Sequence, residues 1–318
     1  MAKLWIVLSL VITPLMSVYD KVTHDDISCH YITEGDTLPS TEDISFSPPP
    51  DSIFFHETSC QGVMNSRQAC AIESAAKAHP GKNVYVLFSG PTGDTRFSNR
   101  NSLFELSLFY PNINFARVHI DEYAKDTPLQ NILKNITNYP SQRRVFYTSE
   151  YLRFITLHKF GGLYLDTDVI VIKPLYSLGK NWVARESNLF VNNAVICQPG
   201  LVMWTMVCWY EVMVWRYNHP LVCIRIHPLL SSTSLILTES LIPGFQVHDS
   251  ELIYPVSYRH FFKLLEPGDL PKVNHAYTVH LWNGYSHGEK VQRSSPFDRM
   301  AEQYCPVIRE LYRDCFGT

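Results

Sequence analysis

The 318-residue sequence has no long run of basic residues, no internal repeat and no pair of cysteines spaced C-x₂-C. Without a polybasic run, and with a formal net charge of −3, nucleic-acid binding is not expected. Without C-x₂-C spacing, the common zinc and redox motifs are not expected either. Charged residues make up 18% of the chain and hydrophobic residues 46%, which excludes a mainly disordered protein. The length suits one large domain or two modest ones with a sizeable core.

The uncharged N-terminal segment is shorter than the roughly 20 residues that a membrane-spanning helix prefers. It runs from Leu4 to Val18, about 15 apolar residues. We interpret residues 1–19 as a signal-anchor or signal peptide. Residues 20–51 are polar and end in SFSPPPD, where consecutive prolines favour an extended stem. The folded domain is then expected over residues 52–318, in the lumen of the secretory pathway.

The eight cysteines are too few for a fold built mainly on disulfides, but they fit an oxidising compartment. Cys60 and Cys70 are candidates for one bridge, and Cys305 and Cys315 for another, although spacing alone does not fix the pairing. The sequon at residues 135–137 would accept a glycan in the lumen.

Strand and helix patterns alternate along the chain, which predicts an α/β domain with a largely parallel sheet. One helix is expected to begin at Ser66 and to stop at His79, and another to begin at Ser149 and to end at Gly161. Two helices separated at Pro306 are expected near the C-terminus. Strands are predicted over residues 52–58, 83–90, 112–120, 163–172, 189–197 and 278–283.

The stretch KFGGLYLDTDVIVIKPL, from Lys159 to Leu175, places two carboxylates in an apolar strand. Side chains at i and i+2 of a strand project to one side, so Asp166 and Asp168 would lie together, about 7 Å apart along the backbone. Such like charges repel, and hard cations such as Mg²⁺ and Mn²⁺ bind carboxylates and bridge diphosphates. The pair therefore predicts a metal that holds phosphates at the end of a strand. The alternative is a solvated turn between two strands, which the preceding amphipathic helix and Gly-Gly turn make less favourable.

The segment from Ser149 to Leu175 closely resembles the DxD region of the α-1,4-glycosyltransferase family. Further similar pieces lie in the same order within about residues 52–215 and 245–310: IFFHETS, ACAIESAAKAHP, FYPNINF, DTPL, VNNAV, YPVSYRHF, AYTVHLWN and QYCP. The resemblance implies a GT-A fold, which is a Rossmann-like nucleotide-sugar-binding domain, on a single-pass type II anchor in the Golgi membrane. It also implies Mn²⁺, a UDP-sugar donor, a glycolipid or glycoprotein acceptor, and retention of the anomeric configuration.

The resemblance also implies roles for individual residues. Asp166 would contact the ribose and the metal, Asp168 would be the main metal ligand, and His280 would be the third protein ligand. From the residues alone, a histidine in VHLW is more often a satisfied core residue, and it is the resemblance that favours ligation. The remaining donor-site residues are expected to be Glu57 and Ser59 on the uridine side, Arg153 at the phosphates or ribose, Asn192 near the sugar, and Tyr164 and Trp282. Trp282 could close over the donor or belong to the core, and no catalytic nucleophile or base is assigned.

Three departures from the family pattern stand out. Glu150 replaces an aspartate, Asn193 replaces a glycine, and residues 219–242 lack a WG…GP…(I/L)TR segment expected to shape the donor-sugar and acceptor pocket. No glycine occurs between Leu201 and Pro243, although glycine lets a backbone approach a ligand closely. We interpret this stretch either as a diverged acceptor site or as a mis-spliced or frame-shifted part of the sequence.

The sequence thus predicts a Golgi glycosyltransferase that moves galactose or an N-acetylhexosamine from a UDP-sugar to the terminal sugar of a glycosphingolipid in an α-1,4 bond. The alternative, motivated by the replaced segment, is an inactive relative that binds a UDP-sugar or serves as a partner of an active transferase. A metal-dependent phosphodiesterase would need more carboxylate or histidine ligands than the sequence clusters near Asp166.

Overall fold

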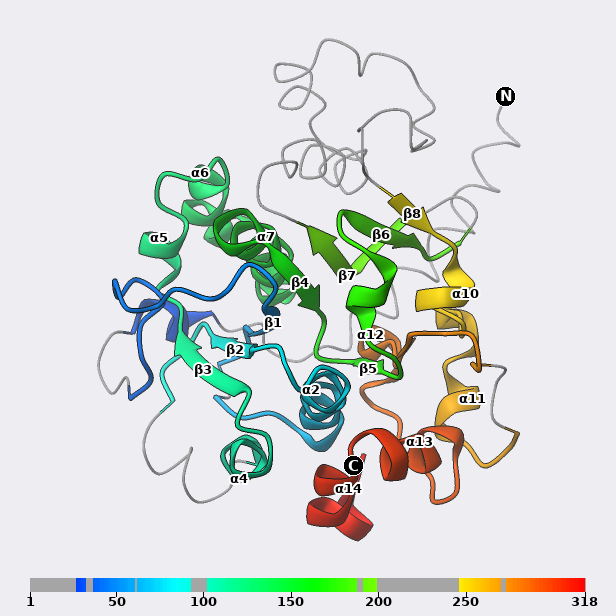
Figure 1. Ribbon diagram of the computed structural model, residues 1–318. Helices are drawn as coiled ribbons and strands as arrows, with labels where there is room; N and C mark the ends of the chain where they lie inside the picture. Colours follow the sequence, from blue (N-terminus) through cyan, green and yellow to red (C-terminus); the bar gives the residue numbers. More distant parts are fainter. Residues whose placement is uncertain are drawn as a thin grey trace, which may run out of the picture.

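The computed structural model describes residues 27–32, 37–60, 62–92, 102–187, 191–198, 246–269 and 273–317. The described strands are β1 (Ile53–Glu57), β2 (Val84–Phe88), β3 (Ile113–Arg117), β4 (Gly162–Leu165), β5 (Val169–Val171), β6 (Trp182–Arg185), β7 (Val191–Gln198), β8 (Gln246–His248) and β9 (Thr278–His280). One sheet has the strand order β3-β2-β1-β4-β7-β6-β8 (Figure 1). Strand β5 pairs with β9 in a second, two-stranded sheet. The neighbours of β7 run antiparallel to it and the other pairs of the large sheet are parallel. The predicted α/β domain with a mostly parallel central sheet is confirmed.

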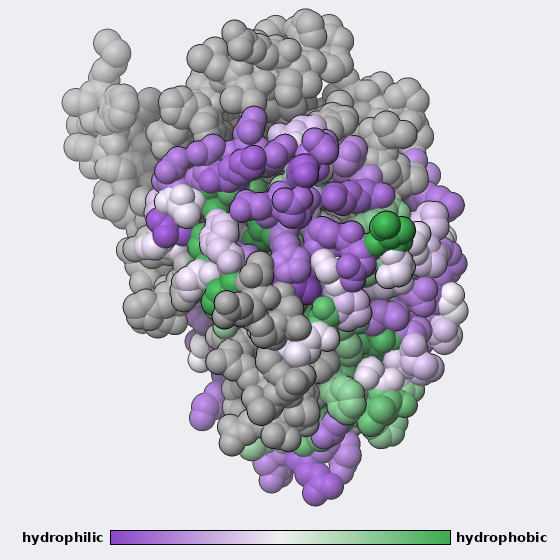
Figure 2. All heavy atoms as spheres, turned by 90° about the vertical axis from the view of Figure 1, so that its left-hand side faces the viewer, coloured by the Kyte–Doolittle hydropathy of each residue, from purple (hydrophilic) through white to green (hydrophobic). Residues whose placement is uncertain are grey.

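The described α-helices cover both faces of the large sheet. They are α2 (Ser66–Ala78), α4 (Ser102–Phe109), α5 (Ile120–Tyr123), α6 (Gln130–Lys134), α7 (Arg144–Phe160), α10 (Ser250–Ile253), α11 (Phe262–Leu265), α12 (Asn283–Ser286), α13 (Pro296–Tyr304) and α14 (Pro306–Tyr312). Strand β1 shows the layering: Ile53 and Phe55 join one core cluster with Ile72 of α2, whereas Phe54 joins another with Ile155 of α7. A central strand buried on both faces is typical of layered α/β domains. The face beside α5 and α6 is mainly hydrophilic, with scattered hydrophobic residues (Figure 2).

Helix α2 begins as a capped helix, but its cap is Asn65 rather than the predicted Ser66. The Asn65 side chain accepts a hydrogen bond from the Gln68 amide at 3.0 Å, and the Gln68 side chain accepts from the Asn65 amide at 3.0 Å. This reciprocal pair is a capping box, which satisfies two amides that the helix leaves free. The Ser66 hydroxyl instead accepts from the Gly317 amide at 2.8 Å.

Helix α7 is longer than predicted, because it starts at Arg144 and not after Ser149. The Ser149 hydroxyl donates to the Phe146 carbonyl inside the helix, the local bond that serine makes when it does not cap. The predicted end is confirmed: Gly161 and Gly162 have positive φ values of 67° and 92°. A Cβ at Gly162 would lie 2.3 Å from the Ser52 carbonyl oxygen, so the close approach of β1 requires glycine there.

The C-terminal helices α13 and α14 meet at Pro306 as predicted. The predicted disulfides are wrong, because Cys60 pairs with Cys29 and Cys305 pairs with Cys70. The second bridge joins positions 235 apart, since α2 packs against α13 and α14. Sequence spacing does not report such contacts.

The described part of the predicted stem lies against the domain. Ser40 bridges to Arg117 of β3, the Thr41 amide donates to the Arg117 carbonyl at 2.8 Å, and the Arg117 amide donates to the Pro39 carbonyl at 2.8 Å. At Ser40 this segment therefore adds one parallel bridge to the edge strand β3. The predicted anchor, residues 1–19, lies outside the described residues, and so do residues 219–242. Within the described ranges, no helix combines the length and the hydropathy that crossing a bilayer requires.

Candidate functional site

Asp166, Thr167 and Asp168 form a turn between β4 and β5, which belong to different sheets. The Val169 amide donates to the Asp166 carbonyl at 3.1 Å across this turn. The prediction that both carboxylates lie inside one strand is therefore wrong, because the chain leaves the large sheet after Leu165 to pair with β9. The turn is not solvated throughout, since Asp168 is only 7% exposed.

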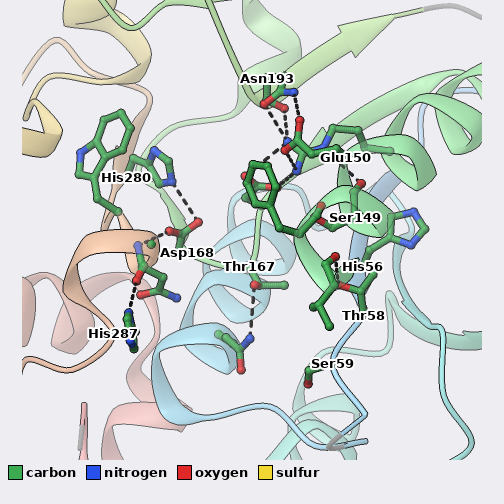
Figure 3. A pocket seen from close by; sticks show the side chains of 18 of the residues that line it. His56, Thr58, Ser59, Ser149, Glu150, Thr167, Asp168, Asn193, His280 and His287 are labelled. Atoms are coloured by element: carbon green, nitrogen blue, oxygen red, sulfur yellow. Dashed lines mark hydrogen bonds and ion pairs between the residues drawn. The ribbon is translucent and has the colours of Figure 1, made fainter. Parts of the chain in front are cut away.

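Strand pairing brings His280 beside this turn. In the β5–β9 pair, Val169 lies opposite His280, so the histidine comes next to Asp168. His280 Nε2 lies 3.1 Å from Asp168 Oδ1 (Figure 3), and one ligand atom from each of Asp166, Asp168 and His280 lies within 4.8 Å of the others. The Asn283 amide donates to Asp168 Oδ2 at 2.7 Å and fixes the second carboxylate oxygen. Three side chains from two distant segments therefore share one small volume.

The two carboxylates have different electrostatic surroundings. Burial raises the pKa of Asp166 to about 6, against the opposing effect of the Arg153 charge, and the charge of Asp168 adds to the increase. Burial would also raise the pKa of Asp168, but the His280 imidazole and the Asn283 amide hold that pKa below its ordinary value. In His280 the nearby Asp168 outweighs burial and raises the pKa. Like charges thus oppose each other at this turn, and a divalent cation would relieve the opposition.

The donor set fits such a cation. Two carboxylates and an imidazole nitrogen are ligands that Mn²⁺ accepts, and carboxylates also suit Mg²⁺. Among the described residues that line the surrounding pocket, Arg153 is the single arginine or lysine. The carboxylates that line it are Glu57, Glu150, Asp166, Asp168 and Glu186. This excess of negative charge favours bound cations.

The pocket is a cavity of about 560 Å³ at the carboxyl ends of β1 and β4. Open α/β sheets bind their ligands at this edge. The predicted site residues all line it: Glu57, Ser59, Arg153, Tyr164, Asp166, Asp168, Asn192, His280 and Trp282. The N-terminus of α2 adds Asn65 and Gln68, and α12 adds Asn283. The structure thus brings together residues that the resemblance alone had grouped.

The end of β1 carries a buried carboxylate. Glu57 is 3% exposed, and its Oε1 accepts from the Ser59 amide at 2.8 Å and from the Ser59 hydroxyl. Burial raises the pKa of Glu57 to about 7, although the Ser59 hydrogen bonds oppose the change. Glu57 can therefore exist in either protonation state near neutral pH.

Tyr164 and Asn192 are also oriented by polar contacts. The Tyr164 hydroxyl donates to Asp166 Oδ1 at 2.7 Å. The Asn192 side chain donates to Glu186 Oε2 at 2.8 Å and accepts from the Ala194 amide at 2.8 Å. Glu186 and Asn283 were not singled out from the sequence. Their partners, Asn192 and Asp168, come next to them only through the pairing of strands.

Trp282 has features of both expected positions, in the core and at the wall of the donor site. Its indole is 5% exposed and donates to the Val256 carbonyl at 2.7 Å, as a core residue would. Its ring centroid also lies 4.0 Å from that of His280, at the pocket wall. The predicted strand over residues 278–283 is too long, because β9 ends at His280 and Trp282 has a left-handed φ of 57°.

Two family models match the chain. Residues 65–188 match the glycosyltransferase sugar-binding region containing the DXD motif, and residues 200–312 match the alpha 1,4-glycosyltransferase conserved region. The protein is thus a glycosyltransferase of the DXD class, and the turn described above is its DXD motif. More narrowly, the chain belongs to the α-1,4-glycosyltransferase family. The second match runs across residues 219–242, where the expected segment was not found.

Two relatives found by sequence agree with this assignment. The chain is 29% identical to lactosylceramide 4-alpha-galactosyltransferase of Gorilla gorilla gorilla, with 87% of this chain and 88% of that protein covered. It is 26% identical to human alpha-1,4-N-acetylglucosaminyltransferase, with 82% and 80% covered. A crystal structure of galactosyltransferase LgtC with donor and acceptor sugar analogs has 17% identity and a TM-score of 0.41, with 83% of this chain and 99% of that chain covered. The sequence matches make this chain a hexosyltransferase and do not favour the inactive-relative alternative.

Proposed function

We propose that the protein transfers galactose or an N-acetylhexosamine from a UDP-sugar to the terminal sugar of a glycosphingolipid, in an α-1,4 bond with retention of configuration. We further propose that the folded domain has the GT-A fold, the Rossmann-like nucleotide-sugar-binding fold. The observation that carries the proposal is the convergence of Asp166, Asp168 and His280 in a pocket at the carboxyl edge of the sheet. The name of the galactosyltransferase relatives supports lactosylceramide as the first acceptor to test.

Asp166, Asp168 and His280 would hold the divalent cation, for which we propose Mn²⁺. When bound, such a cation neutralises negative charge on the leaving diphosphate. The protein prepares the ligands in advance: the Asn283 amide orients Asp168, and the Arg153 guanidinium orients Asp166. Preorganised ligands need little rearrangement when the donor enters, which favours catalysis.

The remaining walls would hold the other parts of the donor. Glu57 and Ser59, at the end of β1, would bind the uridine, and Asn192, at the start of β7, would lie near the hexose. Arg153 and Tyr164 complete the donor site next to Asp166. Trp282 would exclude water on the His280 side, since its indole already packs there.

We also propose that the enzyme acts in the Golgi lumen, on a single-pass type II anchor within residues 1–19. The bridges Cys29–Cys60 and Cys70–Cys305 support an oxidising compartment, because cytosolic thiols are kept reduced. The exposed sequon residue Asn135 is accessible to glycosylation there.

The test uses the full-length chain in detergent micelles with lactosylceramide. UDP release is measured from UDP-galactose and from UDP-N-acetylglucosamine, with Mn²⁺ or with EDTA, and linkage analysis is applied to the glycolipid product. We expect release that requires Mn²⁺ and that falls at least about 100-fold in Asp168→Ala. Turnover that is indifferent to EDTA, or undiminished in Asp168→Ala, would contradict the proposed function.

A further inference from the structure

Glu150 and Asn193, two positions at which the sequence departs from its family pattern, contact each other. They lie 43 positions apart, on α7 and on β7, and Asn193 Nδ2 donates to Glu150 Oε2 at 2.6 Å (Figure 3). Glu150 is 3% exposed, so its carboxylate depends on protein partners and not on water. The two departures are thus one structural feature.

Both residues hold the same guanidinium. Arg153 Nη2 lies 2.8 Å from Glu150 Oε1, and Arg153 Nη1 donates to Asn193 Oδ1 at 3.0 Å and to the Asn193 carbonyl at 2.8 Å. Arg153 itself is 2% exposed. The three side chains therefore form a closed triangle in which each contacts the other two.

The far side of the guanidinium faces the DXD turn. Arg153 Nη2 lies 3.1 Å from Asp166 Oδ1 and Nη1 donates to Asp166 Oδ2 at 3.4 Å, a two-pronged contact. The Arg153 guanidinium also lies over the Tyr164 ring, 4.7 Å from its centroid. Because the guanidinium is planar and rigid, fixing one side of it fixes the direction of the other. The position of Asp166 thus depends on contacts that Arg153 makes with α7 and β7.

We propose that Glu150 and Asn193 form one coupled positioning unit that sets the place of Asp166, and through it the affinity of the site for the divalent cation. The proposal rests on the proposed function for the identity of the cation and donor. Neither Glu150 nor Asn193 needs to touch the cation. Their effect passes through Arg153 to Asp166, which is one of the cation's proposed ligands.

Coupling follows from hydrogen-bond accounting. Glu150→Asp shortens the side chain by one methylene, so the side-chain NH₂ of Asn193 loses its acceptor. Asn193→Gly removes the donor to Glu150 Oε2 and one acceptor of Arg153. A buried polar group left without its partner costs more than removing both partners. In the double variant both the Asn193 side-chain donor and its Glu150 acceptor are gone, so neither group is left without a partner. Arg153 still has a carboxylate at residue 150 and the backbone carbonyl of residue 193.

The experiment is a double-mutant cycle on the full-length chain in detergent, with Mn²⁺ affinity as its main readout. Mn²⁺ binding is titrated by electron paramagnetic resonance in the presence of UDP, for the wild type, Glu150→Asp, Asn193→Gly and the double variant. We expect each single variant to weaken Mn²⁺ binding by about 10-fold or more. The double variant should bind at least about fivefold more tightly than the product of the two single effects predicts.

Controls separate positioning from simple loss of stability. Asn114→Gly makes the same change within β3, away from the pocket, and should leave Mn²⁺ affinity unchanged while it shows the cost of a glycine in a strand. Melting temperatures are recorded for all variants. If the single effects multiply in the double variant, or if Mn²⁺ affinity merely follows the melting temperature, the inference is overturned.

UDP release measured on the same proteins separates the two proposals. If the wild type binds Mn²⁺ but releases no UDP from either donor, the proposed function fails while the binding cycle still decides the coupling. If the wild type does not bind Mn²⁺ with UDP present, the positioning unit has no ligand site to act on and the inference fails as well.

Discussion

The two carboxylates of the DXD turn are supported by regions of different construction. Asp166 directly follows β4 of the large sheet and is supported by Arg153 and Tyr164. Asp168 precedes β5 in the two-stranded sheet and is supported by His280 and Asn283. The site therefore spans a junction between two sheets, and its geometry depends on how firmly the smaller one is held.

The two-stranded sheet needs support from outside, because an isolated pair of short strands is marginally stable. Helix α2 supplies it, because the Val171 amide of β5 donates to the Ser74 hydroxyl at 2.9 Å. Just beyond these elements, the Leu175 amide donates to Nε2 of His79, the residue that caps α2, at 2.8 Å. The same helix is tied to the C-terminal helices through the Cys70–Cys305 bridge. The large sheet, by contrast, is buried between its own helix layers.

The largest effect should come from the carboxylate on the two-stranded side. Asp168→Asn keeps the size of the side chain but removes the charge that faces His280, so Mn²⁺-dependent UDP release should fall by about 100-fold or more. Asp166→Asn should cost less, because Asp168, the expected main metal ligand, and its neighbour His280 both remain. Asp121→Asn, an exposed control in α5, should leave release unchanged. Equal losses at Asp166 and Asp168 would show that the two supports contribute alike.

The next effect concerns the two disulfides, one on each side of this comparison. Cys70–Cys305 closes a separation of 235 positions and Cys29–Cys60 one of 31. Replacing either pair by serine should lower the free energy of unfolding by about 2–5 kcal/mol, and the longer loop should cost about 2 kcal/mol more. Urea unfolding of both double variants measures the difference. If removing Cys29–Cys60 lowered the free energy of unfolding more than removing Cys70–Cys305, the C-terminal helices and the two-stranded sheet would not depend more on their bridge than the large sheet does.

These two sides also differ in how far the sequence predicts them. Strands β1, β2, β3 and β7 of the large sheet and the end of α7 were predicted, because hydrophobic period and glycine punctuation are local signals, whereas the short strands β6 and β8 were not predicted. The break between β4 and β5 was missed, because apolar residues lie on both sides of the DTD triplet and nothing local shows that Val169 pairs with His280. The disulfide partners were missed for the same reason. Long-range pairing decides both, and a single sequence contains no direct record of it.

The site residues were identified through the resemblance rather than through geometry. The i, i+2 argument placed Asp166 and Asp168 together for a reason that does not hold, since a turn and not a strand brings them together. The contact between Asn193 and Glu150 was visible in the sequence only as two unconnected departures. A family pattern can therefore indicate which residues meet without indicating which contacts hold them.

The third prediction tests a buried carboxylate of the large-sheet side. The pKa of Glu57 is about 7 in the folded protein and 4.5 ordinarily, so the folded state binds the proton more tightly than the unfolded chain does. The cost of burying the charge is therefore absent well below pH 4.5 and complete above pH 7. Glu57→Gln should raise the free energy of unfolding by up to about 3 kcal/mol at pH 8 and by much less at pH 5. Urea unfolding at both pH values measures this, and a gain independent of pH would contradict the assignment.

The smallest effect on the free energy of unfolding, with the opposite sign, is expected at Glu73, the buried carboxylate that contacts the C-terminal helix α14. Glu73 of α2 accepts hydrogen bonds from the Tyr110 hydroxyl at 2.9 Å and from the amides of Val307 and Ile308, at 2.9 and 2.8 Å, in the first turn of α14. Burial raises the pKa of Glu73 as well, but both of its oxygens have donors. In Glu57, by contrast, the Ser59 donors are both on Oε1, the Gly62 amide only partly offsets burial, and Oε2 has no hydrogen-bond partner among the described residues.

Glu73→Gln would turn an amide NH₂ toward one of these donors. A donor that faces this NH₂ is left unpaired, and that cost should exceed the relief of the buried charge that the raised pKa indicates, so the free energy of unfolding at pH 8 should fall by about 1 kcal/mol. Glu302→Gln, an exposed control in α13, should change it by less than about 0.5 kcal/mol. If Glu73→Gln stabilises the protein as Glu57→Gln is expected to, then the hydrogen bonds to α14 do not offset burial of the charge. In that case the link between α2 and the C-terminal helices rests on packing and the Cys70–Cys305 bridge.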